Sequence, residues 1–155
     1  FSDKKVEKEK IDIILEAGRL APTAKNNQIQ SIYVAKSNDA LIKIDELTPC
    51  RYNAPLVLLV AFDESEAFVY PGGKYNTGVE DATIVASHMV LAASSLDIDS
   101  CWVNLFDPDK AREKFSLPKN EKIVAMIDLG YANDGVKPLE NHFKRKNIDE
   151  TVKFI

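Results

Sequence analysis

A continuous apolar run at residues 56–62 constrains the fold of this chain more than any other feature. The run reads Leu-Val-Leu-Leu-Val-Ala-Phe and follows directly on Pro55. A short run without polar alternation fits an interior strand that is covered on both faces. Residues 122–129 form a second run that predicts another buried strand. The chain therefore calls for a layered structure around a sheet.

Helical patterns separate these strands. Apolar residues recur at three- and four-residue spacing over about residues 6–20 and again over 39–47, and Asp107-Pro108-Asp109 is a strong start for a helix that ends near Leu117. Residues 79–96 predict a helix buried on nearly all sides, with His88 as a core or interface histidine. Shorter strands are expected at 31–35 and 100–106. Strands that alternate with helices over long sequence distances predict an α/β or α+β layered sheet.

Composition excludes several classes of protein. A chain of 155 residues with 45% hydrophobic and 28% charged residues fits one globular domain spanning residues 1–155. The formal charge of −4 gives no electrostatic reason to expect nucleic acid, and no apolar run approaches the length of a membrane span. The chain opens at Phe1 without a visible signal peptide, so we expect a cytoplasmic protein, from which upstream residues have been removed or omitted.

The cysteines and histidines predict no metal site. Cys50 and Cys101 form no Cys-x-x-Cys pair and no ligand spacing with the two histidines, so we expect partly or fully buried, reduced thiols. The glycine-containing segment 70–78 lacks the spacing of a phosphate-binding loop and is expected to be a surface loop. No nucleophile with a partner base is recognisable.

The segment Ala21–Gln28 is the strongest candidate for a binding loop. It reads Ala-Pro-Thr-Ala-Lys-Asn-Asn-Gln, and Pro22 ends the helix before it. Its hydroxyl and amide side chains offer several donors and acceptors in a small volume, which suits a flat heterocycle with carbonyl and imino edges. The alternative is that these residues only satisfy the backbone of an ordinary turn.

Four segments, in order, resemble the nitroreductase family of FMN-dependent oxidoreductases. The loop 21–28 is similar to the family signature Ala-Pro-Ser-Ala-x-Asn-x-Gln. The helix 79–93 and the strand that begins Ser100-Cys101-Trp102 look like the family's central helix and its Ser-Cys-Trp strand. The strand 123–131, which ends in Gly-Tyr, and the basic stretch 142–146 also match. The resemblance implies an α+β, three-layer α/β/α fold with a central mixed, mainly antiparallel sheet.

The same resemblance implies the binding residues. The flavin ring and ribityl chain are assigned to residues of the loop and of the Ser-Cys-Trp strand, and the phosphate to the basic stretch: Pro22, Thr23, Asn26, Gln28, Trp102, Val103, Asn104, Leu105, Arg145 and Lys146. Arginine offers phosphate a bidentate fork that lysine cannot. Trp102 could equally be a core aromatic residue, and a run of three cations is ordinarily a solvated face.

The resemblance further implies an activity and an assembly. We expect an FMN-dependent oxidoreductase that takes a hydride from NADH or NADPH and passes electrons to a nitroaromatic, quinone or related acceptor by a ping-pong mechanism. The chemistry belongs to flavin N5, so no catalytic side chain and no metal is expected. A homodimer with the flavin site at the subunit interface is implied as well. Alternatives are a flavin enzyme with a different specialised reaction, or a non-catalytic dimeric domain that has lost FMN.

Three departures from the family pattern bear on these expectations. The basic Arg-Arg-Ser-x-Arg-like segment that usually precedes the aromatic residue matched by Phe1, and that normally contributes phosphate and ring contacts, is not among the given residues; either the chain is trimmed or it binds flavin poorly. Ile29-Gln30 stands where Pro-Trp is common, and this changes the pocket wall. Asp97-Ile98-Asp99 replaces a turn that usually contains glycine.

Overall fold

A single four-stranded sheet organises the chain. The structure is a computed structural model that describes residues 1–155. The strands lie in the order β1-β2-β4-β3, and each neighbouring pair is antiparallel. Their bounds are β1 Gln30–Ala35, β2 Leu56–Asp63, β3 Asp99–Val103 and β4 Glu121–Gly130.

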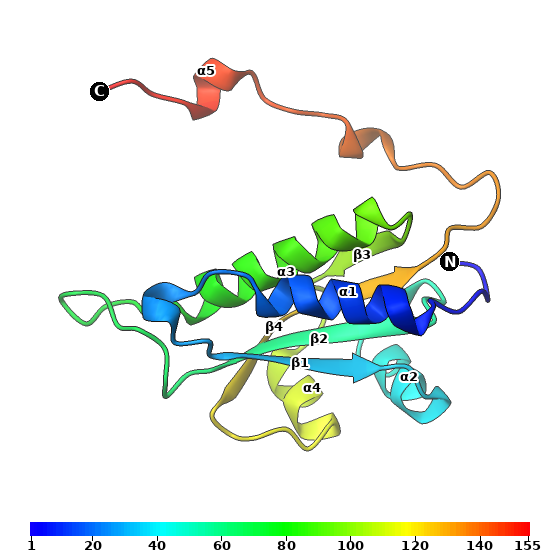
Figure 1. Cartoon of the computed structure of the whole chain (residues 1–155), viewed down its shortest axis with the longest axis horizontal. Coiled ribbons are helices and arrows are strands. Elements are labelled where there is room, and N and C mark those ends of the chain that lie inside the picture. Colours follow the sequence, from blue (N-terminus) through cyan, green and yellow to red (C-terminus); the bar gives the residue numbers. More distant parts are fainter.

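Helices cover both faces of this sheet (Figure 1). The two longer helices lie on one face, and two shorter helices lie on the other. Their bounds are α1 Lys8–Arg19 and α3 Gly78–Ser95 on the first face, and α2 Asn38–Asp45 and α4 Pro108–Lys114 on the second. The predicted α+β, three-layer architecture is thereby confirmed, and all strand pairs within this chain are antiparallel.

Strand β2 supplies side chains to both cores, as its apolar run predicts. Leu56, Leu58, Val60 and Phe62 join the cluster under α1 and α3. The alternate residues, at positions 57, 59 and 61, join the cluster under α2 and α4. Successive side chains of a strand point to opposite faces, so only a strand without polar alternation can sit between two apolar layers.

Two predicted elements differ from the structure. The strand expected at 100–106 ends at Val103, and the side chain of Asn104 instead donates to the Val124 carbonyl at 2.9 Å. Helix α3 is buried on one side only in the single chain: Val79, Ile84 and Leu91 are exposed, and so is His88. A helix that packs against one sheet keeps its outer side free, however apolar that side is.

The last 22 residues form an extended tail. Residues 134–155 are exposed throughout, and apart from one backbone bond to Asn133 their hydrogen bonds stay within the tail. The tail carries one three-residue 3₁₀ turn and the four-residue helix α5, at Glu140–His142 and Ile148–Thr151. In Figure 1 it leaves the end of β4, turns, and runs back above α3, apart from the sheet. None of the helices combines the length and the hydropathy that a membrane span requires.

The start of α3 requires glycine at position 78. A Cβ atom built there would lie 2.0 Å from the Phe62 ring, whereas one at Gly18 would lie 2.8 Å from the flexible Met89 side chain. We expect Gly78→Ala to lower the free energy of unfolding by about 1–3 kcal/mol, because the ring or the helix must move. Gly18→Ala is the matched comparison and should cost less, since the unbranched Met89 side chain adapts more easily than an aromatic ring and alanine favours the helix.

Urea denaturation of the two variants and the wild type measures both effects. Equal losses of stability in the two variants would contradict the close packing of α3 on Phe62.

Candidate functional site

The amide loop, residues 21–28, has an unusual backbone. Helix α1 gives way at Leu20, and the short 3₁₀ turn Ala24–Asn26 follows. Lys25, Asn26 and Gln28 have φ of 53°, 56° and 52°, in the left-handed region. Residues other than glycine rarely adopt this region, because Cβ crowds the following carbonyl. The surrounding structure must therefore hold the loop in this shape.

Contacts from two other segments hold the loop. The Asp81 carboxylate, at the start of α3, accepts a hydrogen bond from the Ala24 backbone N–H at 2.8 Å and another from the Thr77 hydroxyl at 2.8 Å. The Asn27 side chain donates to the Glu66 carbonyl at 3.0 Å. The loop is thus tied to the helix and to the segment that leads into it.

The predicted ring-binding side chains differ in their availability. The Thr23 hydroxyl accepts the Gln28 backbone N–H at 3.0 Å, so part of its capacity closes the loop itself, as the turn interpretation expects. Gln28 donates weakly to the Asn26 carbonyl at 3.3 Å. The Asn26 side chain is exposed and has no hydrogen-bond partner in the chain. Pro22, near the start of the loop, is also exposed.

The second predicted group lies at the end of β3. Trp102 is 38% exposed and Leu105 is 66% exposed, so both present apolar surface to solvent. The side chain of Val103 is buried in the core under α2 and α4, which leaves only its backbone for a ligand. Asn104 keeps its side-chain carbonyl oxygen free after its amide group has bonded Val124.

The single chain does not bring the predicted residues together. The amide loop leads into β1 and Trp102 lies on β3, which are opposite edges of the sheet. Three inter-strand spacings separate these edges, or about 14 Å. Arg145 and Lys146 lie in the tail, where the Arg145 guanidinium donates to the His142 and Lys144 carbonyls at 2.7 Å. A complete site would need surfaces from more than one of these places to meet.

Comparison with known proteins agrees with the fold. The family model described as "Nitroreductase family" matches residues 1–51 and 49–131. The chain belongs to the nitroreductase family. The predicted recognition is therefore confirmed, while the roles of the individual site residues stay predictions.

Individual relatives extend the match over nearly the whole chain. A nitroreductase family protein from Clostridium difficile 630, solved as a crystal structure, has 35% identity and a TM-score of 0.92, covering 99% of this chain and 90% of its own. An FMN-dependent nitroreductase from Clostridium difficile R20291 has 27% identity and a TM-score of 0.78, covering 99% and 91%. An Archaeoglobus fulgidus protein, provisionally named an NADH dehydrogenase/NAD(P)H nitroreductase, is 29% identical over 86% of this chain and 79% of its own length.

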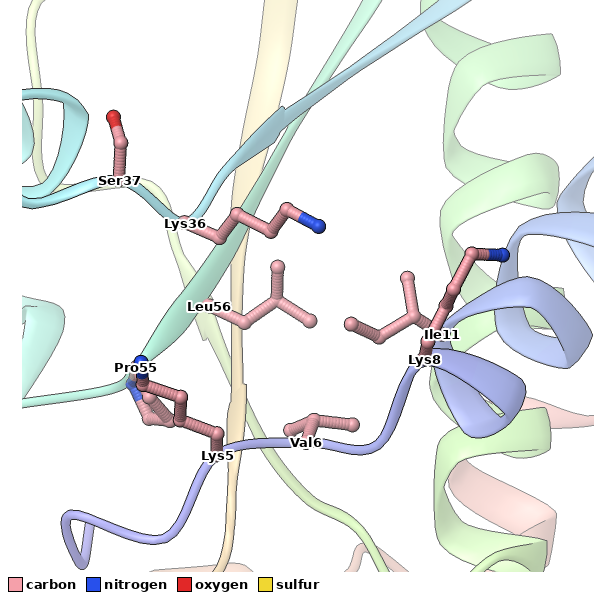
Figure 2. A pocket seen from close by; sticks show the side chains of 8 residues that line it. All are labelled: Lys5, Val6, Lys8, Ile11, Lys36, Ser37, Pro55 and Leu56. Atoms are coloured by element: carbon pink, nitrogen blue, oxygen red, sulfur yellow. The ribbon is translucent and has the colours of Figure 1, made fainter.

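The two principal pockets of the chain lie away from the predicted site residues. One, of about 390 Å³, has a floor that includes Val6 and Leu56 and is bordered by Lys5, Lys8 and Lys36 (Figure 2). All three lysines are exposed, and Lys8 pairs with Asp12. The other, of about 400 Å³, lies between α2 and α4 and has no charged lining residue. Neither pocket brings together polar and charged groups in an arrangement that would select a ligand.

Two buried carboxylates, Asp81 and Asp128, are not predicted by the sequence patterns. Asp81 is 3% exposed and forms part of the support of the amide loop. Asp128 is 1% exposed, and neither of its oxygens has a hydrogen-bond partner. The sequence signal for a buried carboxylate is an acidic residue inside an apolar segment, as at position 128 in the run 123–130. Described residues provide no cluster of three or more His, Cys, Asp or Glu that could hold a metal.

Asp128 faces the core under α2 and α4, directly across the ladder from Cys101. Burial is the main cause that raises its pKa to about 8; Arg51 and the N-terminal amino group oppose this rise, and Asp45 adds to it. Burial also raises the pKa of the Cys101 thiol. This corner of the core therefore favours neutral acids at neutral pH.

The raised pKa of Asp128 predicts a pH-dependent stability. An ordinary carboxyl in the unfolded chain titrates near pH 3.8, so the stability that this group contributes is complete below that pH. It is lost as pH rises toward about 8, by up to about 1.4 kcal/mol per pH unit, because folding must keep the proton. Asp128→Asn should abolish this slope and stabilise the protein at neutral pH.

Urea denaturation at a series of pH values from 5 to about 8 measures the slope. Asp134→Asn, in the exposed tail, is the matched control and should leave it unchanged. Parallel curves for Asp128→Asn and the wild type would show that the carboxylate is solvated in the folded state.

Proposed function

We propose that this protein is an FMN-dependent oxidoreductase that uses NADH or NADPH to reduce small-molecule acceptors. The observation that carries the proposal is an amide loop that is hydrogen-bonded to two other segments and keeps free polar groups, in a chain that belongs to the nitroreductase family. One related protein of known structure is described as an FMN-dependent nitroreductase, and two curated relatives are named for NAD(P)H nitroreductase activity.

The residues of the chain fit the polar and apolar parts of a flavin. Asn26 and Gln28 offer donors and acceptors to the edge of the ring, with Thr23 and Pro22 beside them. Trp102 and Leu105 offer apolar surface, and Asn104 and the backbone of Val103 offer hydrogen bonds. When bound, FMN supplies the hydride and electron chemistry, and the protein orients it and controls access.

We propose that two copies of the chain build each site. The amide loop and Trp102 lie at opposite edges of one sheet, so one copy alone cannot place both against the same ring. Apolar surface suited to a partner is present on the outer side of α3 and along the tail, where Phe143 is 69% and Phe154 is 99% exposed. Exposed apolar patches of this kind mark interaction sites. Residues 1–155 act in this arrangement as one domain of a homodimer.

Arg145, with Lys146 beside it, is the proposed contact for the FMN phosphate. Both lie in the tail, between its 3₁₀ turn and α5, and the tail makes no hydrogen bond to the sheet or to the helices that cover it. If the tail docks on a partner subunit, Arg145 and Lys146 would reach the binding site that the edges of the sheet form.

The proposed reaction consists of two half-reactions, and both substrates use the same binding position in turn. The nicotinamide binds first and leaves, and then a nitroaromatic, quinone or related acceptor takes its place, which gives ping-pong kinetics. No side chain of the protein has to donate or remove a proton. The two unpaired thiols fit a reducing compartment such as the cytoplasm.

The test is reconstitution with FMN followed by anaerobic addition of NADH or NADPH. We expect the visible absorbance of the bound flavin to bleach and to recover on addition of an acceptor, with parallel lines in double-reciprocal plots. Protein that takes up no flavin would support a non-catalytic dimeric domain instead.

Arg145→Gln should weaken FMN binding by about 10- to 100-fold, because it removes a charge-assisted contact worth about 1.5–3 kcal/mol. Titration of the apoprotein with FMN, followed by flavin fluorescence, measures the change. Lys153→Gln in the same tail is the control and should bind FMN like the wild type. Equal affinity of both variants would place the phosphate elsewhere.

Deletion of residues 134–155 should convert the dimer to a monomer and abolish FMN binding, while the sheet and helices stay folded. The tail has no hydrogen bond to them, so its loss leaves no buried group unsatisfied. Sedimentation velocity gives the oligomeric state, and circular dichroism confirms the fold. A truncated protein that remains dimeric would restrict the interface to α3 and the sheet edges.

A further inference from the structure

We propose that Asp81 is a positioning residue that holds the amide loop in its ligand-ready shape. The inference rests on the proposed function for its ligand, FMN, but the clamp itself is a property of this chain. Asp81 lies in the first turns of α3 and is 3% exposed. Its carboxylate is buried against the loop, so it acts on the loop and not on a ligand directly.

Both carboxylate oxygens of Asp81 are used. Oδ1 accepts the Ala24 backbone N–H, and Oδ2 accepts the Thr77 hydroxyl, each at 2.8 Å. The carboxylate thus joins the helix start to the loop across 57 residues of sequence.

Asp81 bonds the loop at Ala24, which is the position where the loop backbone needs support. Ala24 immediately precedes Lys25 and Asn26, which adopt the left-handed conformation. Without an anchor at Ala24, these residues would relax toward ordinary backbone angles, and the exposed amide of Asn26 would point elsewhere. Within the loop, Thr23 and Gln28 bond each other at 3.0 Å, which closes the loop but does not orient it on the protein. Asp81 provides the orientation.

A second tether holds the far end of the loop. Asn27 donates to the Glu66 carbonyl, so this end is attached to the segment between β2 and α3. That segment returns to α3 at Thr77, the other partner of Asp81. Loss of the Asp81 carboxylate would release Ala24 from the helix start and from Thr77, while the bond between Asn27 and Glu66 would remain.

Asparagine can replace this aspartate without loss of either contact. The Asn carbonyl oxygen can accept the Ala24 N–H, and its amide group can donate to the Thr77 hydroxyl, which then acts as the acceptor. Alanine can do neither. A clamp made by hydrogen bonds therefore predicts rescue by Asp81→Asn, whereas a role based on negative charge predicts none.

The experiment compares Asp81→Ala, Asp81→Asn and Glu80→Ala with the wild type. Glu80 is the adjacent exposed acid on the same helix and bonds the Tyr70 hydroxyl, so it controls for the loss of charge at this helix start. Backbone hydrogen exchange of residues 23–28 reports the loop without any cofactor, and FMN titration reports the site. The exchange of strands β2 and β4 and the Tm report the fold.

We expect Asp81→Ala to raise exchange in the loop at least tenfold and to weaken FMN binding at least tenfold, with β2 and β4 still protected. Asp81→Asn and Glu80→Ala should stay within about threefold of the wild type in both. A variant Asp81→Ala with a lower Tm but wild-type loop exchange would overturn the proposal, and so would failure of asparagine to rescue. If the wild type binds no FMN, the proposed function fails, and the exchange measurement still decides the clamp.

Discussion

Burial of β2 on both of its faces is the constraint on which the rest of the molecule depends. One strand supplies alternate side chains to the core under α1 and α3 and to the core under α2 and α4. Neither face of such a strand can be exposed to solvent, so helices must cover both faces of the sheet. The buried backbone N–H and C=O groups of the strand must then form hydrogen bonds within the sheet. Strand β4 shares this environment, and the two form the centre of the sheet. The edge strands β1 and β3, together with the loops beside them, are left to carry function.

The buried acids show how such a core treats polar groups. Asp81 is satisfied by one backbone N–H and one hydroxyl, and it thereby ties the amide loop to the start of α3. Asp128 has no hydrogen-bond partner, and its pKa is raised to about 8, so it stays protonated at neutral pH. A buried carboxyl either finds partners or gives up its charge. Asp81, on α3, thus has a hydrogen-bond partner for each oxygen, whereas Asp128, on β4, has none and destabilises the core when it is charged.

The candidate site is divided between the two edges of the sheet and the tail. This division explains why the two principal pockets of the chain, one bordered by lysines in Figure 2 and one between α2 and α4, contain none of the predicted residues. In the proposed homodimer, the exposed apolar side of α3 and the apolar tail would both meet a second copy, and each chain would contribute half of a binding site.

The sequence by itself determined the layers, most element boundaries and the family, because these depend on local patterns. The apolar run 56–62 predicted a doubly buried strand, Pro22 predicted the end of α1, and Asp107-Pro108 predicted the start of α4, where Asp107 caps the helix. Only the tertiary structure decided that β3 ends at Val103, that α3 leaves one side exposed, and that Asp81 bonds Ala24. Those outcomes depend on contacts between residues far apart in the chain, and no local pattern encodes which distant N–H group a carboxylate will find.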